Sequence, residues 1–259
     1  MNAAASPLFA VHGLTVGVGA RAICRALQFS LMPGEILAIL GRNGIGKSTL
    51  LATLAGLRPP QTGEILLAGK HYAEHGARTA ALLRGWLGQR QEDPFPVTAL
   101  EIALSGRHPH LSRWQWEGDK DVRVARAALA DAGLAGFEER AVQTLSGGER
   151  QRLAIAALLA QETPLMFLDE PLTHLDLNHQ IAMLKIFARR AEAGAALIIV
   201  LHDPGLALRH AGRVLLLYDG GEVSLGPAKA LLTPENLSRL YGHPLLRAET
   251  EGCVAFIPA

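Results

Sequence analysis

The stretch GEILAILGRNGIGKST, residues Gly34–Thr49, decides the fold of this chain. Its first half, Gly34–Leu40, is a short apolar run that follows Pro33 and ends in glycine, as a buried strand does. Its second half, Gly41–Thr49, has the glycine and lysine spacing of a phosphate-binding loop, and the sequence that follows has helical periodicity. Strand, loop and helix in this order predict a βα unit whose turn holds phosphate.

The loop residues have separate tasks in this prediction. Glycines allow successive N–H groups to curl around phosphate oxygens, Lys47 places a positive charge on them, and the Ser48 hydroxyl is a ligand for Mg²⁺. We therefore expect the whole loop to bind a nucleotide, through Gly41, Arg42, Asn43, Gly44, Ile45, Gly46, Lys47, Ser48 and Thr49. The alternative, a chance glycine-rich turn, does not explain the strand before the loop and the helix after it.

Two further apolar runs end on polar residues in the same way. They are TPLMFLDE, Thr163–Glu170, and ALIIVLHD, Ala196–Asp203, and they alternate with helical patterns. This alternation predicts a parallel sheet with crossover helices, on which ligands bind at the carboxyl ends of the strands. At those ends we expect Asp169 to hold Mg²⁺, Glu170 to act as general base for an attacking water, and His202 to reach a γ-phosphate. The alternatives are an acidic helix cap for the Asp-Glu pair and a structural role for the histidine.

The remaining patterns predict two additions to this core. Runs on both sides of the loop, LFAVHGLTVGV, AICRALQFSLMPGE and TGEILLAG, predict an antiparallel flap, and an Asp-Gly-Gly turn near the end predicts a hairpin. From about Asp93 to Arg140 the pattern is helical, which predicts an inserted helical subdomain. We expect residues 1–92 to form the first part of the core with the flap and the loop, residues 93–157 the helical subdomain, and residues 158–259 the second part of the core with a C-terminal extension.

Composition and charge argue against several classes of protein. The chain has 259 residues, and its 25 basic and 24 acidic side chains leave a net charge of +1, which gives no case for a basic face that binds nucleic acid. Its two cysteines, Cys24 and Cys253, are far apart in sequence, which argues against a zinc site or a disulfide framework. The N-terminus lacks a signal-peptide pattern, and no apolar run approaches the roughly 20 residues of a membrane span. We therefore expect a cytosolic chain with no nucleic-acid partner.

The segment LSGGERQR, Leu145–Arg152, places a serine and two glycines immediately before a helical run. Glycine costs about 1 kcal/mol relative to alanine inside a helix, so this placement suits a site where bare N–H groups receive an anion. The alternative is an ordinary helix cap, in which Ser146 and Glu149 form a capping box. Taken alone, the segment favours the cap.

The motifs GRNGIGKST, LSGGE, LMFLDE and LHD occur in this order, and with them the sequence resembles the ATP-binding cassette (ABC) ATPases over nearly its whole length. The LSGGE element distinguishes that family from other P-loop proteins. The resemblance implies an α/β fold with a P-loop NTPase (RecA-like) core, an antiparallel β flap and an inserted helical subdomain. It also implies that ATP and Mg²⁺ are the cofactors and that two chains sandwich two ATPs. The signature residues that would then face the γ-phosphate of the other chain are Ser146, Gly147, Gly148 and Glu149.

Three further roles are implied by the resemblance. Gln89 in WLGQ resembles the Q-loop glutamine, which senses Mg²⁺ and the attacking water and links the core to the helical subdomain, and Gln91 is a competing candidate. Asp176 in PLTHLD resembles the D-loop aspartate, which connects the two sites of the dimer, and His202 resembles the switch histidine. The expected catalytic residues are then Glu170, His202 and Gln89, and the expected metal ligands are Ser48, Gln89 and Asp169.

One position departs from the family pattern. Where many members place an aromatic ring that stacks on adenine, the segment LTVGVGARA offers Val18. A valine side chain lacks the roughly 0.5–1.5 kcal/mol that an aromatic contact adds beyond area burial. We therefore expect modest selectivity for the base of the nucleotide.

The segments GRHPH and PLTHLDLNHQ look most like those of ATPases from importers of iron chelates, haem and vitamin B12. This resemblance implies a homodimer that is peripheral to the cytoplasmic face of the inner or plasma membrane. The implied partners are two integral membrane permease subunits, docked beside Gln89, and, indirectly, a periplasmic or surface substrate-binding protein. The histidines of HPH and the tryptophans of SRWQW fit a docking surface better than a haem or metal site.

Two other functions use the same motifs. A soluble ABC protein uses the clamp as a regulatory or assembly switch, and the ATPase of an exporter works without a binding protein. Soluble members often carry two cassettes or long inserts, whereas this chain has one copy of each motif.

Overall fold

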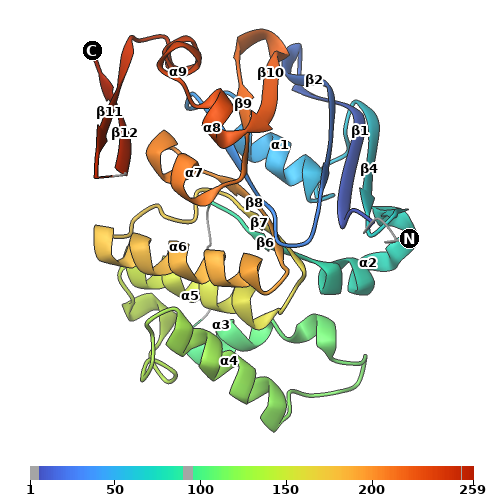
Figure 1. Cartoon of the computed structure of the whole chain (residues 1–259). Coiled ribbons are helices and arrows are strands. Elements are labelled where there is room, and N and C mark those ends of the chain that lie inside the picture. Colours follow the sequence, from blue (N-terminus) through green and yellow to red (C-terminus); the bar gives the residue numbers. More distant parts are fainter. Residues whose placement is uncertain (1–5, 90–95, 252) are drawn as a thin grey trace, which may run out of the picture.

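The computed structural model describes residues 6–89, 96–251 and 253–259, and a six-stranded sheet lies at its centre (Figure 1). The strand order is β10-β9-β3-β8-β7-β6. All of its neighbouring strands are parallel except β10, which is antiparallel to β9. The strands are β3 (Ile36–Gly41), β6 (Arg84–Leu87), β7 (Leu165–Leu168), β8 (Ala196–Val200), β9 (Arg213–Leu217) and β10 (Val223–Pro227). The three apolar runs that the sequence indicates as strands are β3, β7 and β8, and they lie side by side.

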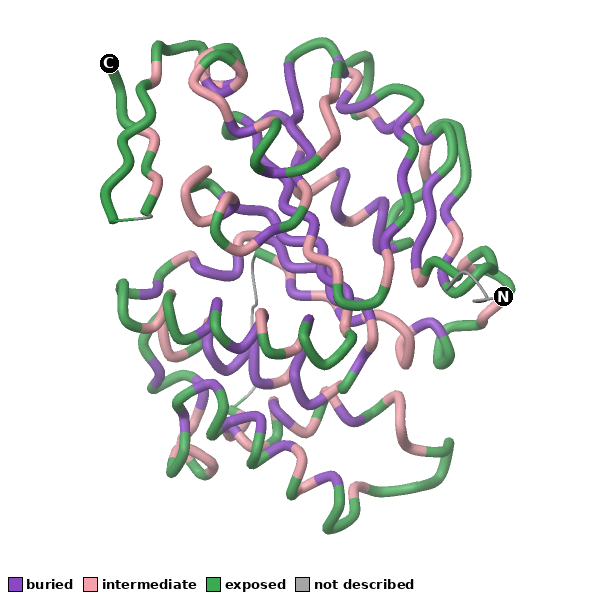
Figure 2. Tube along the Cα trace, in the orientation of Figure 1, coloured by how far each residue is buried: buried purple, intermediate pink, exposed green. Residues whose placement is uncertain are grey.

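The central sheet is covered on both faces, which explains why its inner strands are apolar throughout. Leu37 and Ile39 of β3 pack on the side of the flap, together with helix α1 (Lys47–Leu54). Ala38 and Leu40 alternate with them and pack on the other side. The helices there are α5 (Gly147–Ala160), α6 (Leu177–Glu192) and α7 (Pro204–His210). Figure 2 shows the strands of this sheet as a buried centre between more exposed helices.

The flap is a four-stranded antiparallel sheet in the order β2-β1-β4-β5, as the alternating runs predict. Its strands are β1 (Phe9–Val18), β2 (Arg21–Leu31), β4 (Thr62–Leu67) and β5 (Lys70–His71). Phe9 of β1 packs edge-on against Phe167 of β7, with ring centroids 5.6 Å apart. The flap therefore shares one apolar layer with the central sheet.

The helical subdomain contains α3 (Ala99–Ser105), α4 (Asp119–Asp131) and two short turns of 3₁₀ helix, η1 (His108–His110) and η2 (Val142–Thr144). Arg107 is buried among them, with 1% of its surface exposed. Its Nε atom pairs with Asp121 at 3.0 Å, and its Nη1 atom donates to the carbonyl oxygen of Ala160 at 2.8 Å. This buried arginine joins the subdomain to the last residue of α5. The sequence-based boundary at residue 157 falls within α5.

The C-terminal end of α5 is also pinned to the start of β6. The Gln161 side chain donates hydrogen bonds to the carbonyl oxygens of Ala81 (2.6 Å) and Arg84 (3.2 Å). These carbonyls lie where helix α2 (Tyr72–Leu83) passes into β6. One helix thus connects the LSGG segment at its start with the strand that leads to Gln89.

The hairpin of β9 and β10 was expected from the sequence, whereas helix α2, strand β6 and the separate elements within the C-terminal extension were not. Helix α2 is interrupted at Gly76 (φ 70°), and β6 has only 4 residues. The C-terminal extension follows the hairpin of β9 and β10, whose turn holds the short helix η3 (Asp219–Gly221). The extension consists of α8 (Ala228–Leu231), α9 (Pro234–Tyr241), β11 (Leu245–Thr250) and β12 (Cys253–Pro258). None of the helices in residues 6–89, 96–251 and 253–259 is both long and apolar enough to span a bilayer.

Candidate functional site

The phosphate-binding loop joins the end of β3 to the start of α1. Gly44 (φ 73°) and Gly46 (φ 112°) adopt the left-handed conformation, in which other residues are strained. A Cβ atom on Gly46 would also lie only 2.6 Å from the Cδ1 atom of Ile23 in β2. Gly46 is the N-cap residue of α1 and brings no side chain to that helix end. The N–H groups at the start of α1 are therefore left for an anion.

Lys47 lies at the base of this loop and is 4% exposed. Its ammonium group donates to the carbonyl oxygens of Gly41 (3.0 Å) and Arg42 (3.2 Å). Burial lowers the pKa of Lys47, and the nearby carboxylates of Glu170 and Asp169 oppose that shift. The cation is thus held between the loop and two acidic side chains, where phosphate oxygens would add the negative charge that burial takes from water.

Asp169 follows β7 and is 2% exposed, and its Oδ1 atom has no hydrogen-bond partner among the described residues. Burial raises the pKa of the Asp169 carboxyl, and a hydrogen bond with the Ser48 side chain lowers it. An unpartnered carboxylate oxygen beside a hydroxyl is a pair of hard oxygen donors, which fits Mg²⁺. Mg²⁺ keeps several waters and takes phosphate oxygens as further ligands, so few protein ligands are needed.

Glu170 is the next residue, and two hydrogen-bonding side chains hold its carboxylate. The Nε2 atom of His202 lies 2.8 Å from Oε1, and the Nε2 atom of Gln89 donates to Oε2 at 3.0 Å. These three residues follow β7, β8 and β6, whose carboxyl ends lie at one edge of the sheet. Glu170 also has a φ of 51°, a conformation that costs a residue with a side chain of this kind on the order of 1–3 kcal/mol.

These side chains enclose a cavity of about 370 Å³. It is lined by Asn43, Gly44, Gly46, Lys47, Ser48, Thr49, Gln89, Glu170 and His202. The structure therefore brings together the loop and the three residues predicted as catalytic. Gln91, the competing candidate for the Q-loop position, lies outside the described residues.

The signature residues do not line this cavity. At the start of α5, the Ser146 hydroxyl accepts from the N–H of Glu149 at 3.3 Å, and the Glu149 carboxylate accepts from the N–H of Ser146 at 2.7 Å. This is the capping box that the sequence offered as the alternative to an anion site. Beside it, a Cβ atom on Gly148 would lie 2.9 Å from the carbonyl oxygen of His174. The signature therefore packs closely on the segment that leads to Asp176.

Asp176 caps the next helix. Its Oδ1 atom accepts from the N–H of His179 at 2.9 Å, and the Nδ1 atom of His179 lies 2.9 Å from the same carboxylate. The backbone hydrogen bond from His179 is the main reason that the pKa of Asp176 lies below its usual range. The side chain is 65% exposed, so it remains open to a second molecule.

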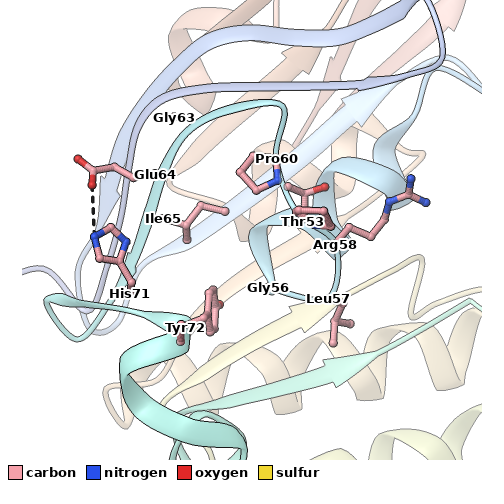
Figure 3. Close-up of a pocket in the computed structure, with 12 residues that line it drawn as sticks. Thr53, Gly56, Leu57, Arg58, Pro60, Gly63, Glu64, Ile65, His71 and Tyr72 are labelled. Carbon is pink, nitrogen blue, oxygen red and sulfur yellow. Dashed lines mark ion pairs between the residues drawn. The ribbon is translucent and has the colours of Figure 1, made fainter.

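A second, larger cavity of about 510 Å³ lies at the other end of α1, beside β4 and the start of α2 (Figure 3). Most of its lining is apolar, and several of its polar side chains are paired with one another or with the backbone. The Tyr72 hydroxyl donates to the carbonyl oxygen of Leu54 at 3.0 Å, and Glu64 lies 3.5 Å from His71, as the dashed line in Figure 3 marks. The phosphate-binding loop, Glu170 and His202 line the smaller cavity and not this one, so the smaller cavity is the candidate reaction site.

Two residues close to the site were not singled out in the sequence. Arg21 donates from Nη1 to the carbonyl oxygen of Gly44 at 2.9 Å, and the Tyr241 hydroxyl donates to the carbonyl oxygen of His202 at 3.3 Å. The short Gly19–Ala20 turn after Val18 could have indicated Arg21, because residues on either side of a tight turn pair. Nothing local in the sequence indicates Tyr241, which lies 39 residues from His202.

Comparison with known proteins agrees with this geometry. The family model described as ABC transporter matches residues 24–173, which is more than half of the chain. The chain belongs to the ABC transporter family. The hemin import ATP-binding protein HmuV of Gloeobacter violaceus is 42% identical over 255 residues, covering 95% of this chain and 92% of that protein. The ferric enterobactin transport ATP-binding protein FepC of Escherichia coli K12 is 39% identical over 233 residues, covering 88% and 85%.

Solved structures of ABC proteins share the fold. One, described as an ABC transporter of the metal-chelate type in an inward-facing conformation, superimposes with a TM-score of 0.85 at 31% identity and covers 98% of both chains. A nucleotide-free ATP-binding cassette has a TM-score of 0.74 at 18% identity, over 91% of this chain and 95% of that one, and supports the fold alone. The predicted fold class and family are confirmed. As an ABC ATP-binding subunit, this chain binds ATP and is an ATPase.

Proposed function

We propose that this ABC ATPase is the ATP-hydrolysing subunit of an importer of a metal chelate, namely haem, an iron-siderophore or vitamin B12. Two relatives of similar length, which are named for hemin import and for ferric enterobactin transport, support the first two substrates. The metal-chelate type of the structural neighbour supports the class as a whole. The observation that carries the hydrolytic part is the Glu170 carboxylate, held by His202 and Gln89 at the mouth of a phosphate-binding cavity.

In this proposal, the loop and Lys47 hold the β- and γ-phosphates, because the amides at the start of α1 and the ammonium group face the same cavity. Ser48 and Asp169, with Gln89 beside them, would hold Mg²⁺. When bound, Mg²⁺ neutralises charge that develops on the phosphate oxygens. The buried carboxylate of Asp169 needs such a counter-charge, since burial alone disfavours its ionised form.

Glu170 acts on the water that attacks the γ-phosphate. One carboxylate oxygen accepts the proton of that water while the hydrogen bonds from His202 and Gln89 fix the orientation of the group. General base catalysis of this kind typically contributes about 10²- to 10⁴-fold in rate. Because His202 and Gln89 follow separate strands, this orientation depends on how the carboxyl ends of those strands are arranged.

The active assembly is a dimer of two copies in this proposal. Ser146, Gly147 and Gly148 of one copy face the γ-phosphate bound by the other, and Asp176 lies close to the same interface. The dimer works at the cytoplasmic face of the membrane with two permease subunits and, indirectly, a substrate-binding protein. ATP closes the dimer, and hydrolysis allows it to reopen.

Uptake measurements test the proposal. Cells that lack this chain are given labelled haemin, a labelled ferric siderophore or labelled vitamin B12, and are complemented with wild type or with Glu170→Gln. Uptake of one chelate that only wild type restores is the expected result and identifies the substrate. No loss of uptake for any of the three, while the purified chain still hydrolyses ATP, would contradict the importer assignment and favour the switch or exporter alternatives.

A further inference from the structure

The turn between β1 and β2 lies at the mouth of the phosphate-binding loop. Val18 and Arg21 are the last residues to pair across this turn. Val18 is 52% exposed, and the Arg21 side chain is 55% exposed. Because paired residues of two antiparallel strands point to the same face, the two side chains lie together. A base whose phosphates are held in the loop would therefore meet a valine and a guanidinium at this turn.

Arg21 is already fixed to the loop. Its Nη1 atom donates to the carbonyl oxygen of Gly44 at 2.9 Å, and Gly44 lines the cavity that holds Lys47 and Ser48. Ile23, two residues further along β2, lies on Gly46 so closely that a Cβ atom there would come within 2.6 Å. Side chains two apart in a strand share a face, so Arg21 and Ile23 cover neighbouring parts of the same loop.

We propose that the guanidinium of Arg21 stacks on the nucleotide base, with Val18 packing at its edge, in the position where an aromatic ring is missing from this chain. This inference rests on the proposed function, since it requires a nucleotide in the loop. A guanidinium is planar, weakly hydrated and able to stack on aromatic faces, which an ammonium group cannot do. One hydrogen bond to Gly44 already restricts the side chain, so less rotamer freedom is lost when the base arrives.

Asp219 steadies this arginine without neutralising it fully. Its carboxylate lies 3.6 Å from Nη2 of Arg21 and 3.5 Å from Nη1 of Arg42. Both arginines and Asp219 are more than half exposed, and ion pairs at such sites are weak. One carboxylate shared by two exposed guanidinium groups leaves a net positive charge at the turn. That charge favours contact with the electron-rich face of a base.

Stacking of this kind does not depend on the identity of the base, because every base has a π-face. The proposal therefore gives a structural reason for the modest base selectivity that Val18 implies. Arg21 should increase the affinity for ATP and for GTP, whereas it should not increase the affinity for a polyphosphate without a base.

The test compares nucleotides with a probe that has no base. Dissociation constants for ATP, GTP and inorganic tripolyphosphate are measured by isothermal titration calorimetry in EDTA, so that no hydrolysis occurs. The proteins are wild type, Arg21→Ala, Arg21→Lys and, as matched control, Arg25→Ala, which removes another exposed arginine of β2. For Arg21→Ala we expect roughly three- to fivefold weaker binding of ATP and of GTP, the size of an exposed cation–π contact, and unchanged binding of tripolyphosphate.

Arg21→Lys should recover only part of the affinity that Arg21→Ala loses, because an ammonium group keeps the charge but lacks the planar face. Adding Val18→Tyr to Arg21→Ala should restore the lost affinity, which a merely structural defect would not allow. The proposal is wrong if Arg21→Ala leaves ATP binding unchanged, if it weakens tripolyphosphate as much as ATP, or if Arg21→Lys binds as wild type does. Failure of wild type to bind ATP and tripolyphosphate would instead overturn the proposed function itself.

Discussion

Helices α1 and α5 both start within glycine-rich segments, and their first turns are built in opposite ways. Helix α1 is capped by Gly46 in the left-handed conformation, with no side chain at its N-terminus, and its first residue is the buried cation Lys47. Helix α5 is capped by Ser146, and the Glu149 carboxylate closes the other half of a capping box. The first helix presents donors and positive charge to an anion. The second has placed its own carboxylate where an anion would lie.

The difference lies in the residues beside the glycines. A negative charge in the first turn satisfies the helix dipole and repels a second anion, so α5 is a weak phosphate site while Glu149 holds its position. Helix α1 has no acidic residue in its first turn. We infer that α1 binds phosphate unaided, whereas α5 gains one only when another molecule brings it. That order, nucleotide first and second copy afterwards, is what a dimer closed by ATP requires.

We expect the largest effect from Glu170→Gln, which should stop turnover without stopping ATP binding. The variant should then accumulate as a dimer in which α1 of one copy and α5 of the other face the same nucleotide. Glu170→Gln keeps the size of the side chain but cannot accept a proton, so we expect the rate of phosphate release to fall about 10²- to 10⁴-fold. ATP binding should persist, and size-exclusion chromatography with ATP and Mg²⁺ should show a stable dimer. Turnover near the wild-type rate would rule out Glu170 as the main base.

A second change removes the support at the far end of α5. Arg107→Leu leaves Asp121 buried without its guanidinium partner, which typically costs 3–5 kcal/mol. We expect about 3 kcal/mol, the low end of that range, because the N–H of Gly118 still donates to Asp121 at 3.1 Å. Urea unfolding measures the loss of stability. Arg126→Leu, at an exposed position of α4, the helix that contains Asp121, is the control and should change stability by less than about 0.5 kcal/mol.

Lys47→Ala tests phosphate binding at the start of α1 and leaves the start of α5 unchanged. Hydrogen bonds to charged groups contribute about 1.5–3 kcal/mol, so nucleotide affinity should fall roughly ten- to a hundredfold. The dissociation constants for ATP and ADP, measured by fluorescence with labelled nucleotides, check this. Equal affinity in the variant and in wild type would mean that the amides of the loop bind the phosphates without the cation.

We expect the smallest effect from Ser146→Ala, which tests whether the start of α5 does more than cap the helix. Ser146→Ala removes an N-cap, which costs about 1 kcal/mol of stability, and it should also lower ATP turnover at concentrations where the dimer forms. Thr98→Ala is a matched control, because Thr98 and Glu101 form the same capping box at the start of α3. It should lose similar stability in urea and keep its turnover. Equal losses of turnover in both variants would reduce the signature serine to an ordinary cap.

Short-range patterns allowed most of the catalytic edge to be predicted. The loop, β7 and β8 are each contiguous in sequence, and the rule that ligands bind at the carboxyl ends of parallel strands indicated a common site for Glu170 and His202. Gln89 came from the family resemblance alone. Its strand, β6, begins with Arg84 and Gly85 and has only 4 residues, so it lacks the apolar run that indicates a buried strand.

Other elements escaped prediction for equally local reasons. Gly76 interrupts α2 and hides its periodicity. Strand β11 is exposed after its first residue, and β12 alternates only between exposed and half-buried positions, so neither strand carries the apolar run of a buried strand. The contacts of Arg21 and Tyr241 with the site depend on how the flap and the extension fold onto the core. Such contacts are set by tertiary packing: the turn beside Arg21 indicates only its pairing with Val18, and nothing local indicates Tyr241.

The hydrogen bonds of Gln161 fix the C-terminal end of α5, so any rotation of the helix about that end moves its N-terminal end. Its 14 residues span about 21 Å at 1.5 Å per residue, with Ser146 at one end and the Gln161 clamp at the other. A rotation of only about 5° around the clamped end therefore moves the signature by about 2 Å, enough to make or break a hydrogen bond. The orientation of the signature is thus set at the opposite end of the helix, by contacts to the end of α2 and the start of β6, the strand that leads to Gln89.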